Sequence, residues 1–370
     1  MYDVVIGNAW GDEGKGLVTD WLSGPDTVVV RFCGGAQAGH TVVDPDGRRH
    51  VFQHFGSGSF RGATTFLSEF FYCDPEAFVR ELRALRKVGL EPVVRVSPAA
   101  SVVTPYDRLL NQLTEQARAS GRHGSCGYGV GEAAARAEST DSMVRATHVT
   151  YGWLRQVWYN NWASALAYRL DALESHLLLE LDRRGIEVDL SVLRQDMSAA
   201  RTKFIGAVSA FMGETLEWDA GKLEGRKLVF EGSQGLLLDR DLGAFPYVTR
   251  AKTGLVNVEA LLGTLADCRI WFVSRSYFTR HGAGPLPGED PGLRHADSTN
   301  VDNPWQGSLR FAPRDGDVLL DAQARALAEV QTAPGQVRSF VSWTDVPGSE
   351  HLQTDAWSDG PTRLHCHAQS

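Results

Sequence analysis

The chain has 370 residues, of which 43% are hydrophobic and 22% are charged, a composition that is ordinary for a globular protein and sufficient for a large core. The formal net charge is −8 and no long basic run is present, which argues against stable docking on a nucleic-acid backbone. The five scattered cysteines form no CxxC pair, and no apolar run reaches the ~18 residues that span a bilayer, so neither a zinc site nor a membrane segment is expected.

The N-terminal region alternates between apolar runs and glycine loops. Residues 3–7 form a short apolar run that ends at a glycine, residues 17–22 have helical character, and residues 27–32 form a second buried strand. This order predicts a strand–loop–helix–strand unit and therefore a parallel sheet. The first residues lack a basic segment followed by an apolar run, so we expect no signal peptide and a cytoplasmic protein.

The rest of the chain continues the α/β pattern. Further strands are expected at residues 92–96, 227–231 and 270–273. Residues 151–212 carry apolar positions at helical spacing, which predicts a helical insertion over the sheet. Residues 282–314 are rich in Gly, Pro, Asp and Asn, and long loops of this kind are usually functional or disordered. We therefore expect one large α/β domain over residues 1–370.

The strongest motif is the stretch Gly-Asn-Ala-Trp-Gly-Asp-Glu-Gly-Lys-Gly at residues 7–16. Its glycines would let the backbone approach a ligand, and the helix that follows would offer free N–H groups to phosphate. Lys15 adds a positive charge. This loop has two residues more between its glycines than the usual Gly-x-x-x-x-Gly-Lys-Ser/Thr motif, and the longer loop includes Asp12. Phosphate binding alone does not need Asp12, which could bind Mg²⁺ or act as a base.

A second glycine-rich motif, Gly-Gly-Ala-Gln-Ala-Gly-His-Thr, occupies residues 34–41 directly after the second predicted strand. The carboxyl ends of parallel strands line the ligand crevice of such sheets, so both glycine loops should face one site. His40 could serve there as a general acid or as an electrostatic stabiliser.

These motifs resemble the adenylosuccinate synthetase family. Residues 3–16 and 31–41 are similar to its two N-terminal motifs, and the similarity continues in order through residues 124–131, 230–239, 245–249 and 279–287. In the last of these, Thr-Arg-His-Gly-Ala-Gly-Pro stands for the family's Thr-Arg-Val-Gly-Ala-Gly-Pro. The resemblance covers nearly the whole chain. It implies a large, mostly parallel central sheet with a P-loop-like nucleotide site. It also implies an enzyme that couples nucleoside triphosphate hydrolysis to joining aspartate to C6 of a 6-oxopurine monophosphate.

The resemblance also implies roles for individual residues. Asp12 would remove the N1 proton of the purine and, with the carbonyl of Gly39, bind Mg²⁺, while His40 would stabilise the phosphate that moves to O6. The triphosphate would be held by Gly11, Asp12, Glu13, Gly14, Lys15, Gly16, Gly39, His40, Thr41, Asp345, Ser358 and Gly360. The purine monophosphate would be held by Asp12, Gln37, Ser125, Cys126, Gln234 and Thr249, and aspartate by Ser298, Thr299, Asn300 and Arg310.

Three departures from the family affect the substrates. The family's arginine-rich aspartate loop is replaced by residues 298–310, in which only Arg310 remains as a clamp for a carboxylate. The guanine-reading Thr-Lys-Leu-Asp segment becomes Ser-Trp-Thr-Asp at residues 342–345, and the chain is shorter after it. These features resemble the phage branch of 2-aminoadenylosuccinate synthases, which use dGMP with ATP or dATP to make a precursor of 2-aminoadenine DNA. The location would then be the host cytoplasm. Some members of that branch replace the catalytic aspartate by serine, whereas this chain keeps Asp12.

Other interpretations stay open at this point. An ordinary adenylosuccinate synthetase would use IMP, aspartate and GTP. A kinase or GTPase switch would require the standard loop spacing, which is absent, and an inactive homologue would not need Asp12, Lys15 and His40 together. The family implies a homodimer whose site is completed across the interface, and Arg136 and Arg145 are both candidates for the bridging arginine.

Overall fold

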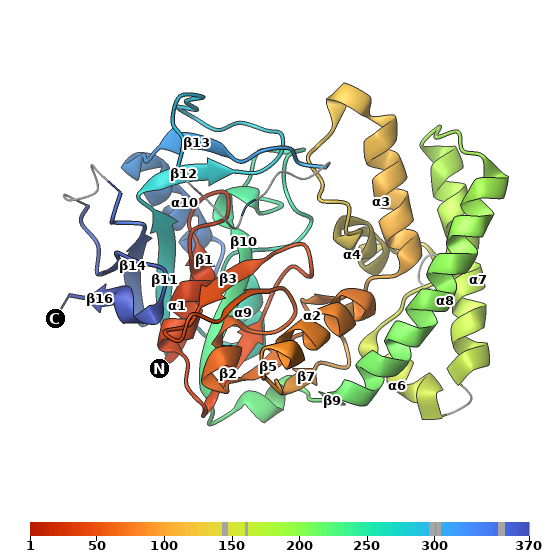
Figure 1. The fold of residues 1–370 in the computed structure, drawn as a ribbon, viewed down its shortest axis with the longest axis horizontal. Coiled ribbons are helices and arrows are strands. Elements are labelled where there is room, and N and C mark those ends of the chain that lie inside the picture. The colour runs from red at the N-terminus through yellow and green to blue at the C-terminus, as the bar shows by residue number, and fades with distance from the viewer. Residues whose placement is uncertain (143–146, 160–161, 296–299, 301–304, 347–351, 370) are drawn as a thin grey trace.

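The computed structural model describes residues 1–142, 147–159, 162–295, 300, 305–346 and 352–369. Within these residues the molecule is built around a ten-stranded sheet (Figure 1), whose order is β16 (Cys366–Ala368), β15 (Ala356–Ser358), β14 (Gln336–Ser342), β11 (Cys268–Arg275), β1 (Tyr2–Gly7), β10 (Lys227–Gly235), β2 (Thr27–Arg31), β5 (Thr64–Leu67), β7 (Val94–Val96) and β9 (Thr215–Glu217). Its neighbouring strands are parallel except β15 with β16. The predicted α/β fold with a large, mostly parallel sheet is confirmed.

The central strands are apolar because both of their faces are covered. β1, β2, β10 and β11 are buried along almost their whole length, and parallel strands in such positions have near-continuous apolar sequences. All four lie where the sequence predicts strands. The predicted strand–loop–helix–strand unit is present as β1, α1 and β2, with β10 between the two strands and parallel to both.

The strand order reverses direction at the middle of the sheet. From β2 the chain adds β5, β7 and β9 toward one edge, and it then returns to insert β10 beside β1. From β11 onward it adds β14 and β15 toward the other edge. Ligands of open α/β sheets bind at such reversals, beyond the carboxyl ends of the strands. The fold thus places a crevice at the ends of β1, β10 and β2.

Local sequence signals explain where the helices begin. In α2 (Pro75–Lys87) the side chain of Asp74 accepts hydrogen bonds from the first-turn amides, and in α3 (Pro105–Ala117) Thr104 and Asp107 form a capping box. Both helices have proline in their first turn, where no backbone N–H is needed. The helix of the first glycine loop, α1 (Lys15–Leu22), instead follows Gly14 in the left-handed region, at φ 92°.

The segment expected as a helical insertion contains α6 (Tyr151–Tyr159), α7 (Trp162–Arg183) and α8 (Leu190–Glu214). These helices gather with α3 at one end of the molecule (Figure 1), where α8 packs on α2 and α7 packs on α3. Their apolar faces share one core with β5 and β7. None of the described helices is long and apolar enough to cross a bilayer.

The remaining elements flank the sheet. Three two-stranded ladders are described: β3 (His40–Val43) with β4 (Arg49–Phe52), β6 (Tyr72–Cys73) with β8 (Ser101–Val102), and β12 (Tyr277–Arg280) with β13 (Arg310–Pro313). The predicted long loop over residues 282–314 therefore ends in a strand that pairs with the segment before it. The other α-helices in the described part of the chain are α4 (Val130–Glu138), α9 (Val256–Leu262) and α10 (Gly316–Ala328).

β10 packs so closely against the first glycine loop that no side chain fits at Gly235, and this can be tested by mutation. Its backbone is extended, so alanine is allowed conformationally, but a Cβ there would overlap the Ala9 carbonyl oxygen and the Glu13 carboxylate. Gly235→Ala should lower the free energy of unfolding by about 1–3 kcal/mol. The control is Gly206→Ala on the exposed side of α8, where a Cβ meets nothing within 4 Å; it should stabilise the helix by up to about 1 kcal/mol. Equal stability of the two variants in urea denaturation would contradict this packing.

Candidate active site

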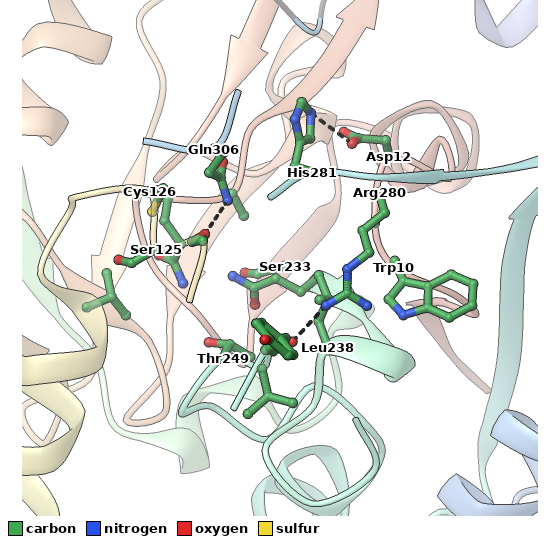
Figure 2. A pocket seen from close by; sticks show the side chains of 18 of the residues that line it. Trp10, Asp12, Ser125, Cys126, Ser233, Leu238, Thr249, Arg280, His281 and Gln306 are labelled. Carbon is green, nitrogen blue, oxygen red and sulfur yellow. Dashed lines mark hydrogen bonds and ion pairs between the residues drawn. The ribbon is translucent and has the colours of Figure 1, made fainter. Parts of the chain in front are cut away.

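A cavity of about 420 Å³ opens at the carboxyl ends of β1, β10 and β2 (Figure 2). Residues 10–16 and 37–41, which follow β1 and β2, form part of its wall, so the two glycine loops face one cavity. The remaining wall comes from Asn111, Glu115, Arg118, residues 123–126 and 129–132, Ser233, Gln234, Leu238, residues 245–250, Arg275, Arg280, His281, Ala283, Asn300, Gln306 and Trp343.

Glu13 and Lys15 form a buried ion pair beneath the first loop. Lys15 Nζ lies 2.6 Å from Glu13 Oε2, and both side chains are 2% exposed. The other oxygen of Glu13 accepts hydrogen bonds from the amides of Ala9, at 3.1 Å, and Gly11, at 2.8 Å. Gly7 makes room for the pair, because a Cβ there would overlap the carboxylate. Lys15 reaches the cavity wall, yet a phosphate would have to share it with Glu13.

Asp12 presents its carboxylate to the cavity from a left-handed backbone conformation, at φ 61°, which aspartate tolerates better than most residues. Its Oδ2 lies 3.3 Å from His281 Nε2, and its carbonyl accepts a hydrogen bond from Arg275. Burial alone would raise the pKa of Asp12, but the hydrogen bond and charge of His281, together with Arg275 and Lys15, lower it to about 2. The carboxylate is therefore ionised near neutral pH and can accept a proton or bind a cation.

His40 is fixed by a buried carboxylate that the sequence motifs do not single out. Nδ1 lies 2.6 Å from Glu231 Oε1, and Nε2 lies 3.1 Å from the Ser233 carbonyl oxygen. Burial lowers the pKa of His40, and Glu231 opposes that shift. Glu231 also accepts from the Ser57 amide and lies 3.9 Å from Arg31. Burial alone would raise the pKa of Glu231, but the charge of Arg31 and the hydrogen bonds from His40 and Ser57 lower it to about 2. The imidazole is thus held in one orientation at the cavity wall.

The residues expected to hold the purine monophosphate all line the cavity: Asp12, Gln37, Ser125, Cys126, Gln234 and Thr249. The side-chain carbonyl oxygens of Gln37 and Gln234 are buried and have no hydrogen-bond partner within the part of the chain that the structure describes. Buried polar atoms without partners are rare, so these two oxygens are available to donor groups of a ligand. Burial raises the pKa of the Cys126 thiol to about 11, which keeps it neutral.

The expected triphosphate residues divide into two groups. Those of the two glycine loops line the cavity: Gly11, Asp12, Glu13, Gly14, Lys15, Gly16, Gly39, His40 and Thr41. Asp345 is exposed, and Ser358 donates a hydrogen bond to the Gly360 carbonyl at 2.6 Å; none of these three lines the cavity. Trp343 lines it instead, with its ring centroid 3.9 Å from the guanidinium carbon of Arg275. That Asp345, Ser358 and Gly360 help to bind the triphosphate stays a prediction.

Among the residues expected to bind aspartate, Asn300 lines the cavity, whereas Ser298 and Thr299 lie outside the described residues. Arg310 is not part of the lining. Its guanidinium pairs with Glu289 and donates to the carbonyls of Gly282 and Gly284. A carboxylate ligand would have to displace Glu289, so the clamp role of Arg310 is a prediction that this geometry does not favour.

Of the two candidates for a subunit-bridging arginine, the structure describes only Arg136. Arg136 is buried within its own chain, where it donates two hydrogen bonds to Asp107, at 2.8 and 3.0 Å, and one to the Val102 carbonyl. It is therefore held within its own chain, and a bridging role for it stays a prediction that this geometry does not favour. Arg145 lies outside the described residues.

A glycine loop after the first strand of a parallel sheet, with a carboxylate and a buried imidazole on the wall of one cavity, is typical of an α/β nucleotide-binding protein. The chain belongs to the adenylosuccinate synthetase family, whose sequence model matches residues 4–303. It is 32% identical over 303 residues to the adenylosuccinate synthetase of Psychrobacter cryohalolentis and 34% identical over 292 residues to that of Halothermothrix orenii. Each alignment covers 77% of this chain and 64% of the relative.

Solved structures share the fold. The fully ligated adenylosuccinate synthetase of Plasmodium falciparum superimposes with a TM-score of 0.72 at 17% identity, over 100% of both chains. The succinoaminodeoxyadenylate synthetase of cyanophage S-2L, bound to dGMP and to dATP as an energy donor, superimposes with a TM-score of 0.64 at 17% identity. That alignment covers 99% of this chain and 94% of the phage enzyme.

The environment of Glu231 predicts how stability depends on acid. Its pKa falls from the ordinary 4.5 to about 2 in the folded state, so its stabilising contribution is complete above pH ~4.5 and is lost as pH falls toward about 2. Glu231→Gln should therefore lower stability at neutral pH and flatten its dependence on pH in that window. A residual slope from Asp12 and Glu81, whose pKa values are also lowered to about 2, should remain.

Urea denaturation at a series of pH values measures this effect. Glu187→Gln is the control, because Glu187 is exposed and makes none of these contacts. If the free energy of unfolding of Glu231→Gln depends on acid pH as strongly as that of the unmodified protein, Glu231 does not contribute this pH-dependent stability.

Proposed function

We propose that the protein is a ligase that joins L-aspartate to C6 of dGMP, with ATP or dATP as the energy donor. The products are N6-succino-2-amino-2'-deoxyadenylate, the nucleoside diphosphate and phosphate. The observation that carries the proposal is the Asp12 carboxylate on the wall of a cavity that is also lined by His40, whose imidazole the buried Glu231 holds. Membership of the adenylosuccinate synthetase family supports the class of reaction.

The reaction needs activation because a purine O6 is a poor leaving group. In the proposed sequence Asp12 takes the proton from N1, and O6 attacks the terminal phosphorus of the triphosphate while the bond to the nucleoside diphosphate breaks. The amine of aspartate then attacks C6, loses a proton, and phosphate leaves with the former O6. His40, held through Nδ1 by Glu231, faces the charge that builds on the moving phosphoryl group.

Mg²⁺ fits the residues at this cavity. Asp12 offers an ionised carboxylate and Gly39 a backbone carbonyl, and both line the cavity. Among the described residues no group of three His, Cys, Asp or Glu side chains could hold an ion. This suits a cation that takes most of its oxygen ligands from substrate phosphates and water. When bound, Mg²⁺ would neutralise charge during phosphoryl transfer.

Two features support the dGMP branch and an adenine donor. In the segment that replaces the family's guanine-reading motif, Asp345 is exposed and is not part of the cavity lining, and Trp343 rests on Arg275. Strong discrimination by hydrogen bonds requires the partners to be present, so a preference for GTP is not expected. The phage enzyme that shares the fold, bound to dGMP and dATP, is consistent with this choice.

The second candidate is the ordinary reaction of IMP, aspartate and GTP. It is favoured by the curated relatives, which are adenylosuccinate synthetases, and by the retention of Asp12. A homodimer is part of either proposal and is drawn from the family.

A product assay separates the two candidates. Purified protein is incubated with Mg²⁺ and aspartate, with dGMP, GMP or IMP as acceptor and ATP, dATP or GTP as donor, and products are followed by mass spectrometry. We expect a succinyl adduct of dGMP, with phosphate released in equal amount and ATP or dATP at least as effective as GTP. An adduct of IMP formed with GTP, and none from dGMP, would assign the protein to the ordinary reaction.

Asp12→Asn is the matched variant for that assay. Asparagine tolerates the left-handed conformation of this position, so the loop should keep its shape. Loss of the base should lower turnover by at least ~100-fold. Near-normal turnover in the folded variant would remove Asp12 from the mechanism.

A further inference from the structure

His281 is the only described side chain whose charged or polar end pairs with the Asp12 carboxylate. Its Nε2 lies 3.3 Å from Asp12 Oδ2 and 3.1 Å from Asn300 Oδ1, and Figure 2 shows the imidazole and the carboxylate pointing toward each other. A valine at this position could not donate a hydrogen bond, so the contact depends on the histidine itself.

The chemistry of the two partners favours one tautomer of His281. A carboxylate oxygen and an amide oxygen are both acceptors, so an Nε2 that carries hydrogen can donate to Asn300 Oδ1 and faces the Asp12 carboxylate favourably. One imidazole nitrogen then contacts two segments that are distant in sequence. The first is the glycine loop with Asp12, and the second is the segment with Asn300 that is expected to meet aspartate.

The backbone around His281 is firmly held. Arg280 donates to the carbonyls of Ala283, Pro285 and Tyr247, and this fixes the end of β12. The next residue, Gly282, turns at φ 72° and packs closely on the Gly124 backbone. His281 thus stands on a rigid support, and it can hold a carboxylate that projects from a loop.

We propose that His281 is a positioning residue that aims the Asp12 carboxylate into the purine subsite and links it to Asn300 in the aspartate subsite. This inference rests on the proposed function, because the aim of Asp12 matters only if it removes the N1 proton. A fixed contact on one oxygen directs the second oxygen toward the purine N1 and the Mg²⁺ that Asp12 would also bind. It also makes the two subsites dependent on each other, since the same imidazole nitrogen contacts both Asp12 and Asn300.

The test compares His281→Val, which restores the family's residue, with His281→Gln, which keeps an N–H donor. His281→Val should lower kcat by about tenfold, while the KM of the triphosphate changes by less than about twofold. His281→Gln should recover a large part of the loss. In the Asp12→Asn background the His281→Val change should have no further effect on kcat, because residues that act as a unit are not additive.

Three outcomes would overturn the inference. The first is an active protein in which His281→Val keeps its full kcat. The second is a loss in His281→Val that persists undiminished in the Asp12→Asn background. The third is a fall in kcat that tracks a fall in thermal stability across both His281 variants, which would indicate a structural role only.

A second readout keeps this inference separate from the proposed function. In protein labelled with ¹⁵N-histidine, the His281 ring signals are identified by their loss in His281→Val. They should report a protonated Nε2 that shifts in Asp12→Asn and in Asn300→Ala. If no purine monophosphate is converted but these shifts occur, the proposed function fails and the His281 contact stands. If conversion occurs and the ring signals do not shift, the positioning role is wrong.

Discussion

Beneath the loop that follows β1, the buried carboxylate of Glu13 accepts hydrogen bonds from two loop amides and pairs with Lys15. Removing one partner of such a buried pair leaves an uncompensated charge, which typically costs about 3–5 kcal/mol. Gly7 and Gly235 lack side chains where that carboxylate must fit. The Glu13–Lys15 pair fixes the turn in which Asp12 adopts a positive φ. The shape of that turn determines where the Asp12 carboxylate lies in the cavity. Lys15 therefore serves first as a support for the loop and only then as a charge for phosphate.

The fold was predictable where it depends on local pattern. The continuous apolar runs of β1, β2, β10 and β11 are typical of strands buried on both faces, and the helical spacing after residue 151 indicates helices. The order of the strands was not predictable in this way. β10 lies about two hundred residues after β1 and β2 in the sequence, yet it pairs with both. Such pairing depends on packing between distant segments, which no local pattern records.

In the site, too, the residues within local motifs could be predicted, whereas their partners from distant segments could not. Asp12 and His40 stand out in the sequence because they occur within glycine motifs, but the groups that orient them come from elsewhere in the chain. Glu231 is a single acid in an apolar strand, a signal that could have marked it as a buried partner. His281 differs from the family's valine, which is a second usable signal. Arg310 was chosen because it is the last arginine of its loop, and the sequence does not reveal that Glu289 holds it.

Transfer of the purine oxygen to phosphate is the central claim, and it can be followed directly. The acceptor dGMP, labelled with ¹⁸O at C6, is converted in the presence of Mg²⁺, aspartate and ATP, and the released inorganic phosphate is analysed by mass spectrometry. The proposed reaction predicts one ¹⁸O atom in each phosphate released, because O6 attacks phosphorus and leaves with it. Unlabelled phosphate, with the label retained in the nucleotide or lost to water, would contradict activation of the purine at O6.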